Sequence, residues 1–561
     1  MAEPKLLLDY VYAHEVVHPD QIYLTQPVGG GQVVDYTWGQ TLDQARRMAA
    51  HLRSLGFAPG ARIAILSKNC AHFFIAELAI WIGGYTTVAI FPTESASTIG
   101  FVLEHSDASL LFVGKLDSWE QQAAGVPAGL PCIALPLAPR TTLESWDAVI
   151  ARTPALTGQV ARAPADLAML IYTSGSTGQP KGVMHSFERI TRATEGILAS
   201  LKELEDPRRP VQPRVLSYLP LAHSLERAWV ECASMADGRV RVYFAESVDT
   251  FLQDLKRARP TFFASVPRLW LKFQQGVYAK MAPHKLERLL KVPVLGRIIG
   301  RKVLAGLGLD QVLLAGSGSA PIPAELIAWY RRLGLKLLEA YGMTEDFAYS
   351  HGSTELLNEP GWVGVPNAGV QVRLADDGEV LIRSPGQLVG YYKRPDLDAQ
   401  SFTADGYFRT GDLGERRADG MLRITGRQKE LFKTSKGEYV APAPIENQLN
   451  VHPMVELSLV SGPGQPAPFA MLVLAEDLRP RLGDLAVRAE VERELGQLLL
   501  AVNARHAPHE RLRMLVVAAE PWTIENGCLT PTMKVKRSRI EAGLAPQVGA
   551  WYAQPGAVHW A

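Results

Sequence analysis

The sequence has 561 residues and a formal net charge of +1, with 47% hydrophobic and 20% charged residues. This length predicts about two to four domains, and the composition is typical of soluble globular proteins. The near-zero net charge gives no indication of a nucleic-acid partner. The four cysteines are scattered and form no CxxC pair, which indicates reduced, structural thiols and a cytoplasmic protein.

The N-terminal region contains one strongly apolar segment, residues 73–91, that is nearly long enough to cross a bilayer. Glu77 lies within it, and the pair Gly83 and Gly84 interrupts it. We therefore predict a buried helix over residues 72–82, followed by a core strand over 87–91, in place of a membrane span. Residues 1–9 lack the basic and apolar regions of a signal peptide.

Helical and strand-like patterns alternate through the first half of the chain. The predicted helices cover residues 41–55, 98–105, 224–235, 251–257 and 269–281. The predicted strands cover residues 62–66, 110–113, 167–171, 215–219, 240–244 and 262–265. This βαβ order predicts a largely parallel sheet covered by helices.

After residue 361 the pattern changes to short alternating runs separated by turn signals. Runs at residues 370–374, 379–383 and 421–425 predict an antiparallel β region. A smaller unit begins beyond Arg427, with helices near 444–450 and 485–502 and strands at 457–459 and 469–474. The expected fold class is therefore α/β and α+β. A large N-terminal domain, residues 1–427, contains layered α/β subdomains and a β-rich subdomain, and a small α+β C-terminal domain covers residues 428–561.

One loop, residues 172–182 (YTSGSTGQPKG), follows a predicted buried strand and contains three glycines, four Ser/Thr hydroxyl side chains and Lys181. Such a loop offers closely spaced backbone N–H groups, and the lysine adds a positive charge, which suits a polyphosphate. It differs from the Walker P-loop, where Gly, Lys and Ser/Thr follow one another directly. A plain surface loop is the alternative on this stretch alone.

Several further stretches carry residues suited to chemistry, although each has a plain structural alternative. They are residues 312–321, 338–345, 406–412, 424–446 and 530–534. Asp412 could be a turn residue, Arg427 a surface arginine, and Glu345 the cap of a turn. His223 could be packed in the core, and Lys534 could belong to a solvated basic run with Lys536 and Arg537.

Taken together and in order, these stretches resemble the adenylate-forming superfamily of acyl-CoA synthetases, luciferases and peptide-synthetase adenylation domains. The resemblance covers most of the chain: the glycine-rich loop, then YGMTE at 341–345, Gly411–Asp412, Gly426–Arg427 and the late lysine. Segments 218–227, 265–270 and 530–537 are most similar to the long-chain fatty acyl-CoA synthetases. A long-chain fatty acid–CoA ligase is thus implied.

The resemblance implies ATP, Mg²⁺ and CoA as cofactors and co-substrates, with a fatty acid as the acyl donor and no nucleic-acid partner. It implies a first half-reaction giving acyl-AMP and pyrophosphate, and a second in which CoA takes the acyl group. Because the start of the chain shows no membrane helix, we expect a soluble, cytoplasmic protein or one attached peripherally to a membrane. A homodimer is also left open.

The resemblance further implies an ATP site. Its residues would be Thr173, Ser174, Gly175, Ser176, Thr177, Gly178, Lys181, Gly318, Ser319, Ala320, Tyr341, Gly342, Asp412 and Arg427. The loop from Thr173 to Lys181 would hold the β- and γ-phosphates. Residues 318–321 and Tyr341 would enclose adenine, and Asp412, assisted by Arg427, would bind the ribose hydroxyls.

The remaining implied roles concern catalysis and domain movement. Thr344 would contact the α-phosphate, and Glu345 would help to hold Mg²⁺. Lys534 would neutralise charge that builds up around the α-phosphate and the attacking carboxylate. The C-terminal domain would rotate about Lys429 between the two half-reactions, bringing the segment around Gly437 to the CoA tunnel. His223 would lie near the acyl pocket.

Two positions depart from the commonest family pattern. Met533 precedes the late lysine where Gly is usual, and the nearby Lys536 leaves open which of the two lysines acts. Lys436 precedes Gly437 where a second Gly is frequent. Three alternatives also stay open: a CoA ligase for a medium-chain or aryl acid, a fatty acyl-AMP ligase that loads a carrier protein, and a catalytically silent nucleotide-binding protein. The sequence does not predict the acyl chain length.

Overall fold

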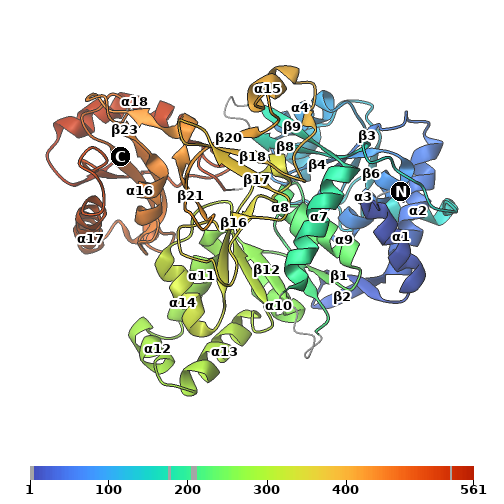
Figure 1. The fold of residues 1–561 in the computed structure, drawn as a ribbon, viewed down its shortest axis with the longest axis horizontal. Coiled ribbons are helices and arrows are strands. Elements are labelled where there is room, and N and C mark those ends of the chain that lie inside the picture. Colours follow the sequence, from blue (N-terminus) through green and yellow to red (C-terminus); the bar gives the residue numbers. More distant parts are fainter. Residues whose placement is uncertain (1–4, 175–178, 204–210, 531–532) are drawn as a thin grey trace.

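The computed structural model describes residues 5–174, 179–203, 211–530 and 533–561. The chain forms a large N-terminal domain and a small C-terminal domain, drawn in orange and red at one side of the molecule (Figure 1). The predicted fold class is thus confirmed. Among the described residues, no helix combines the length and apolar character needed to cross a membrane.

The largest sheet has eight strands and lies in the N-terminal domain. In spatial order they are β19 (Gly390–Tyr391), β9 (Pro180–Ser186), β8 (Leu167–Ser174), β4 (Thr86–Ile90), β3 (Arg62–Leu66), β5 (Ala108–Val113), β6 (Cys132–Ala134) and β7 (Glu144–Ser145). The strands from β8 to β7 are parallel, whereas β9 and β19 are antiparallel additions at one edge. Ile63 and Ala64 on β3 pack into two different apolar clusters, so both faces of the sheet are covered.

Helix α3 (Ala71–Gly83) contains most of the apolar segment that is nearly long enough for a membrane span, and all of its residues are buried inside the domain. Its C-terminus is capped by Gly84 in the left-handed conformation, with φ +94°. Strand β4 follows directly. The predicted buried helix and core strand are therefore confirmed.

Two further sheets of the N-terminal domain contain both parallel and antiparallel pairs. One is β10 (Arg214–Ser217), β11 (Arg241–Phe244), β1 (Ile22–Gly29) and β2 (Gln32–Thr37). The other is β12 (Phe262–Ser265), β13 (Leu314–Ser317), β14 (Leu337–Tyr341), β15 (His351–Gly352) and β16 (Val365–Pro366). Nearby helices are α10 (Phe251–Ala258), α11 (Pro267–Tyr278), α12 (Pro283–Leu290), α13 (Leu295–Leu307) and α14 (Ala324–Leu333).

The β-rich subdomain and the C-terminal domain complete the chain. The first is a fully antiparallel sheet of β17 (Gln371–Leu374), β18 (Glu379–Arg383), β20 (Phe408–Arg416) and β21 (Leu422–Arg427), as predicted. The second contains β24 (Val455–Ser461), β25 (Phe469–Leu474), β26 (Leu515–Val517) and β27 (Val558–Trp560) with helices α16 (Pro442–Leu449), α17 (Leu485–Asn503) and α18 (Arg537–Ala553).

One predicted helix has an unexpected interior. Residues 224–235 were predicted as a single helix, but they form α8 (Ser224–Glu226), a π-helical segment η2 (Arg227–Cys232) and α9 (Ala233–Asp237). Periodicity cannot separate these helix types because all of them place apolar residues at similar intervals. π-Helical segments are frequent at functional sites.

The π-helical segment places Arg227 in a fully buried group with two carboxylates. Arg227 forms ion pairs with Glu77 of α3 and, at 3.0 Å, with Glu231 one turn away. Burial raises the pKa of the Glu231 carboxyl well above its usual value, and the negative charge of Glu77 raises it further. Arg227 therefore offsets the charge of carboxyl groups that burial alone would disfavour.

Removing the arginine should destabilise the N-terminal domain strongly. Arg227→Ala leaves buried Glu77 without its cation, so we expect a loss of about 3–5 kcal/mol in the free energy of unfolding, measured by urea denaturation. The matched control is Arg373→Ala, which breaks an exposed pair with Asp405 and should cost less than about 1 kcal/mol. Equal losses in the two variants would contradict a structural role for the buried group.

Candidate active site

The candidate site lies at the carboxyl ends of the parallel strands β13 and β14. In open α/β sheets this end of the strands is where ligands bind. The β8–β9 hairpin of the large sheet and strands β20 and β21 of the β-rich subdomain reach the same place, because Val183 and Tyr391 share an apolar cluster with Val380 and Leu422. The site is therefore built where three sheets meet.

The predicted phosphate loop is the turn of the β8–β9 hairpin. Thr173 pairs with Lys181 across the two strands. Gly175, Ser176, Thr177 and Gly178 lie outside the described residues, as does the side chain of Ser174. Burial lowers the pKa of the Lys181 ammonium, and nearby Lys429 also lowers it, while Glu345 acts in the opposite direction. Such a cluster of cations suits an anionic ligand.

Asp412 is the centre of a hydrogen-bonded group that joins strands from two sheets. Tyr341 donates its hydroxyl to Asp412 Oδ2 at 2.7 Å, and Arg427 donates Nε to Oδ1, also at 2.7 Å. Gly411, just before the aspartate, has φ +69°, a conformation that glycine adopts without strain. Each carboxylate oxygen has a further lone pair to offer. The group can thus accept hydrogen bonds from a ligand while it stays fixed.

The turn after β13 presents backbone with little side chain. Ser319 and Ala320 are exposed, and Ser319 has φ +66°. A Cβ atom on Gly342, after β14, would come within 2.9 Å of the Ala348 backbone, so only glycine fits there. Gly318 lies beside the Ala340 carbonyl, which a Cβ atom would meet at 3.4 Å. Close approach of a flat ligand is possible at such a surface.

Thr344 and Glu345 lie on a short 3-10 turn, η3 (Thr344–Asp346), which begins two residues after Gly342. Thr344 is buried, and its carbonyl accepts a hydrogen bond from His185 Nε2 at 2.9 Å. Glu345 Oε1 accepts one from the Tyr391 hydroxyl at 2.9 Å. These contacts fix two of the predicted catalytic residues from the neighbouring sheet.

Three residues of this group were not singled out from the sequence: His185, Asp346 and Tyr391. Burial lowers the pKa of His185 to about 4, so its ring is neutral. Asp346 Oδ1 accepts the amides of Met343 and Tyr349, at 2.9 and 3.2 Å, and holds the turn closed. No local pattern marks these side chains, because their partners are distant in sequence or are backbone groups.

Lys534 comes to this site from the C-terminal domain. Burial among protein groups lowers the pKa of its ammonium, and the positive charge of Arg427 lowers it further, whereas Asp412 and Glu345 raise it. The side chain nevertheless keeps contact with solvent. The Lys534 ammonium therefore lies close enough to the Asp412 group to be influenced by it while it stays accessible from solvent.

The structure also separates the two lysines that the sequence left as alternatives. The charges of Arg427, Asp412 and Glu345 act on Lys534, whereas the charge of Lys536 acts on Glu94 of the N-terminal domain. Lys534 stands on a tight turn in which the Thr530 amide donates to the Lys534 carbonyl at 2.8 Å. Met533 has φ +62° there, a left-handed conformation that explains why glycine suits this position.

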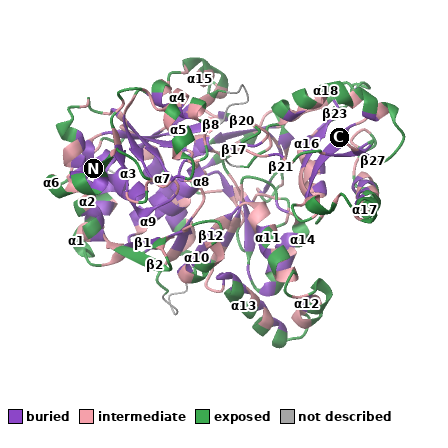
Figure 2. Cartoon of the chain, turned by 180° about the vertical axis from the view of Figure 1, so that it is seen from behind, coloured by how far each residue is buried: buried purple, intermediate pink, exposed green. Residues whose placement is uncertain are grey.

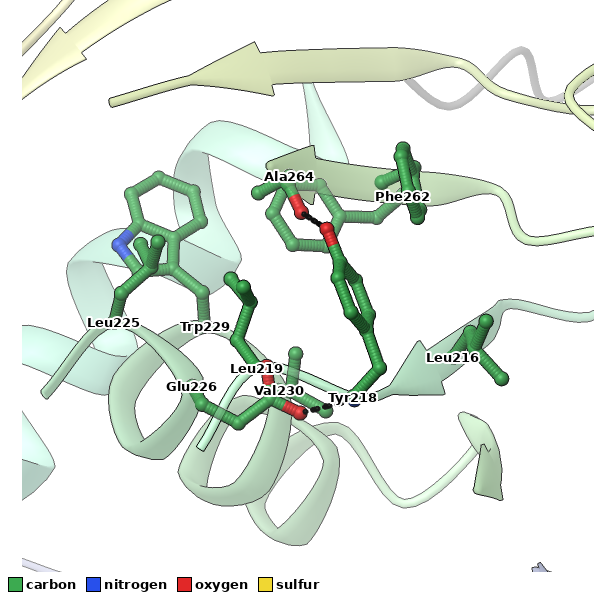
Figure 3. A pocket seen from close by; sticks show the side chains of 10 residues that line it. Leu216, Tyr218, Leu219, Leu225, Glu226, Trp229, Val230, Phe262 and Ala264 are labelled. Carbon is green, nitrogen blue, oxygen red and sulfur yellow. Dashed lines mark hydrogen bonds between the residues drawn. The ribbon is translucent and has the colours of Figure 1, made fainter. Parts of the chain in front are cut away.

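His223 is the residue just before α8, a helix that lines an apolar pocket. Its Nδ1 accepts the Leu225 amide at 3.2 Å, so the ring proton is on Nε2. Burial lowers the pKa of His223 to about 4, and the charge of Lys534 contributes to this shift. The pocket itself is lined by residues of β10, β12 and the helix after His223 (Figure 3).

The pocket is apolar and narrow in this conformation. The side chains of Tyr218, Trp229 and Phe262 face it (Figure 3), and Trp229 stacks on Phe262 with 5.6 Å between ring centroids. The cavity volume is about 10 Å³, enough for about one water molecule. An acyl chain could enter only if these rings moved.

Two predicted residues lie at the edge of this arrangement. Lys429 belongs to η4 (Gln428–Glu430), directly after β21. Gly437, with φ +87°, lies in an exposed turn between β22 (Phe432–Lys433) and β23 (Tyr439–Val440). Among the described contacts, none joins Gly437 to the Asp412 group.

A metal ion would find only part of a coordination shell here. The described residues contain no cluster of three or more His, Cys, Asp or Glu side chains able to hold a metal ion. Glu345 is a single carboxylate next to Thr344 and the phosphate-loop lysine. Mg²⁺ commonly takes one or two carboxylates together with substrate phosphates and water, so the residues present fit an ion that arrives with a nucleotide.

The family of this chain is established by comparison with known sequences. A family model described as AMP-binding enzyme matches residues 13–392, and one described as AMP-binding enzyme C-terminal domain matches residues 430–555. The chain belongs to the AMP-binding enzyme family, so the resemblance found in its motifs is confirmed.

Two relatives match this chain over most of their length. The chain is 32% identical to "Long-chain-fatty-acid--CoA ligase FadD15" of Mycobacterium bovis, covering 97% of this chain and 96% of that protein. It is 27% identical to "Long-chain-fatty-acid--CoA ligase 1" of Homo sapiens, covering 92% and 83%.

Solved structures share the fold. The A domain of carboxylic acid reductase from Segniliparus rugosus, in complex with AMP and a co-purified carboxylic acid, has a TM-score of 0.79 at 22% identity, covering 99% of this chain and 95% of that one. O-succinylbenzoate coenzyme A synthetase from Bacillus subtilis, in complex with AMP, has a TM-score of 0.72 at 22% identity, covering 95% and 98%.

The pocket wall contains a carboxyl group that should make stability depend on pH. Glu226 Oε1 accepts hydrogen bonds from Ser217 Oγ at 2.6 Å and the Tyr218 amide at 3.1 Å, and burial raises its pKa from 4.5 to about 8. Between these two values the folded protein keeps a proton that the unfolded chain has lost, so the free energy of unfolding falls as pH rises.

Replacing this carboxyl should remove that dependence. Glu226→Gln should flatten the fall in the free energy of unfolding between pH 4.5 and about 8, measured by urea denaturation at several pH values. Glu355→Gln, at an exposed ion pair with Lys336, is the control and should leave the slope unchanged. An unchanged slope in the Glu226 variant would show that the group is ionised throughout.

Proposed function

We propose that this protein is a long-chain acyl-CoA synthetase, which joins a fatty acid to CoA and converts ATP to AMP and pyrophosphate. One observation carries the proposal: the charges of Asp412, Arg427 and Glu345 of the N-terminal domain act on the Lys534 ammonium of the C-terminal domain. The names of the relatives matched over the full chain, long-chain fatty acid–CoA ligases, support this substrate class.

ATP would be held by groups from all three sheets that meet at the site. The β8–β9 loop and Lys181 would bind the β- and γ-phosphates through backbone amides and charge. Asp412 would accept hydrogen bonds from the ribose hydroxyls on the lone pairs that Tyr341 and Arg427 leave free. The exposed turn at residues 318–320 and the ring of Tyr341 would enclose adenine. Mg²⁺, with Glu345 as its protein ligand, would offset the charge of the phosphates.

In the first half-reaction, an oxygen of the fatty carboxylate attacks the α-phosphorus of ATP. The new bond forms as the bond between the α-phosphorus and the pyrophosphate oxygen breaks, which gives acyl-AMP and pyrophosphate. Negative charge gathers on the α-phosphate oxygens and is neutralised by the Lys534 ammonium. Neutral His223 can donate Nε2–H to the second carboxylate oxygen, so it orients the acid without adding charge.

In the second half-reaction, the sulfur of CoA attacks the carbonyl carbon of acyl-AMP. The thioester forms as the carbon–oxygen bond to AMP breaks, and the thiol proton leaves to solvent. In the present arrangement of the domains, Lys534 lies at the site of the first half-reaction. We therefore propose that the C-terminal domain turns about Lys429 before this step. The segment around Gly437 would then approach CoA. The domain boundary near residue 427 is part of this proposal.

The direct experiment is a panel of acids assayed with two acceptors. Purified protein with ATP and Mg²⁺ should consume CoA with saturated acids of long chain length and release AMP in equal amount. Fatty acid-dependent pyrophosphate exchange without any CoA consumption, but with transfer to a carrier protein, would favour a fatty acyl-AMP ligase. Preference for a medium-chain or aryl acid would change the substrate class and leave the reaction type intact.

Replacing Lys534 should affect the two half-reactions unequally. Lys534→Ala removes the cation over the α-phosphate, so we expect acyl-AMP formation to slow by about 10²–10³-fold. Thioester formation from supplied acyl-AMP should change little. Lys536→Ala is the matched control and should leave both rates near wild type. Equal loss of both half-reactions in Lys534→Ala, or a larger effect in Lys536→Ala, would contradict the assignment.

An ion pair between the domains offers a second test. Arg268 of α11 forms an ion pair with Glu456 of β24, and Glu456 forms a second ion pair with Arg479. We propose that this contact helps to hold Lys534 at the site, so Arg268→Ala should slow acyl-AMP formation by about two- to fivefold and spare the second half-reaction. The control, Arg373→Ala, breaks a pair within one domain. Equal slowing of both half-reactions would contradict a latch between the domains.

A further inference from the structure

Helices α12 and α13 and the residues beside them carry a concentration of positive charge. Residues 280–302 contain one acidic residue, Glu287, in a chain whose formal net charge is only +1. The basic residues are Lys280, Lys285, Arg288, Lys291, Arg297, Arg301 and Lys302. Glu287 is itself bound to Arg332, at 2.9 Å, so it compensates none of these charges.

All seven basic side chains are exposed. Within the described part of the chain, none of them forms an ion pair or a hydrogen bond with another side chain. Elsewhere in the structure many exposed arginines are paired, for example Arg373 with Asp405 and Arg417 with Asp419. The positive charge of α12 and α13 is therefore available to an external partner.

An apolar tip lies among these cations, at the junction of the two helices. Val292, Val294, Leu295 and Ile298 have exposed fractions of 45%, 67%, 41% and 58%. Val294 has φ +66°, which is rare for a β-branched residue and indicates a turn held in a strained conformation. Contiguous exposed apolar groups of this kind mark interaction sites on soluble proteins.

The tip is also placed where a large flat partner could reach it. Helices α12 and α13 form the lower extremity of the molecule in both views, away from the C-terminal domain (Figures 1 and 2). Figure 2 shows exposed and intermediate residues over much of both helices. No other element needs to move for a planar surface to meet this corner.

We propose that residues 280–302 form a docking surface for a membrane that contains anionic lipids. Unpaired cations at this surface match the negative charge of lipid headgroups, and the apolar tip matches the boundary with the acyl chains. A nucleic acid would match the charge and leave the apolar tip unused. A second copy of the chain would have to bring seven like charges together.

If the proposed function holds, docking here would bring the protein to the source of its apolar substrate. Strand β12, which lines the pocket, leads through α11 directly into the docking helices. The binding claim stands apart from the proposed reaction, because it concerns only these exposed residues. Loss of membrane binding and loss of acyl-CoA synthesis can therefore be measured separately.

The test is co-sedimentation of the full-length protein with vesicles. Wild type should bind vesicles of equal parts phosphatidylcholine and phosphatidylglycerol, bind phosphatidylcholine alone weakly, and lose binding as salt is raised. Lys291→Glu/Arg297→Glu should lower the partition coefficient at least about 25-fold, since each basic residue contributes about fivefold. Val294→Ser/Ile298→Ser should lower it about tenfold.

Matched controls carry the same changes elsewhere. Arg505→Glu/Arg511→Glu alters two exposed arginines of the C-terminal domain, and Leu485→Ser/Leu500→Ser alters leucines with exposed fractions of 82% and 72%. Both should bind vesicles like wild type, and all four variants should retain acyl-CoA synthesis from dissolved substrate. Equal binding by wild type and both patch variants would overturn the proposal. So would a dimer, seen by analytical ultracentrifugation, that the patch variants dissociate without any vesicle binding by wild type.

Discussion

The rest of the site depends on the two hydrogen bonds that the Asp412 carboxylate accepts. Its two oxygens hold the Tyr341 hydroxyl and the Arg427 guanidinium at 2.7 Å, and so tie the end of β14 to the paired strands β20 and β21. Arg427 is also the last residue before the short turn that leads to the C-terminal domain. A ligand bound to Asp412 would therefore contact both sheets and lie next to the domain boundary.

Cations from separate parts of the chain meet carboxylates around this part of the site. Lys181, Arg427 and Lys534 come from three separate parts of the chain, and burial lowers the pKa of both lysines. Bringing like charges together costs free energy unless an anion compensates for them. ATP would supply that anion, and its binding would then favour the domain arrangement in which Lys534 reaches the site. The charge of the ligand and the position of the small domain are thus coupled.

Much of the fold followed from local patterns. Strands at 62–66, 262–265, 379–383 and 469–474 were predicted with the bounds that the structure shows, because alternation and turn residues act over a few positions. The α1 helix (Leu7–Val17) and the β1–β2 hairpin were not predicted. Within the site, the motifs indicated Asp412, Thr344, Glu345 and Lys534, and the structure brings them together. His185 and the Arg268–Glu456 pair depend on contacts between distant segments, which periodicity does not encode. Asp346 binds backbone amides three residues away on either side, and no side-chain pattern marks such bonds. The strained backbone at Met533 was visible only as a departure from the family pattern.

The most direct test of the two-step account is fatty acid-dependent exchange of labelled pyrophosphate into ATP with CoA omitted. The first half-reaction is complete without CoA, so the account predicts exchange that requires the fatty acid and ATP and does not require CoA. Addition of CoA should then give the thioester and AMP in equal amounts. Exchange that proceeds without the acid, or that appears only when CoA is present, would contradict an acyl-AMP intermediate.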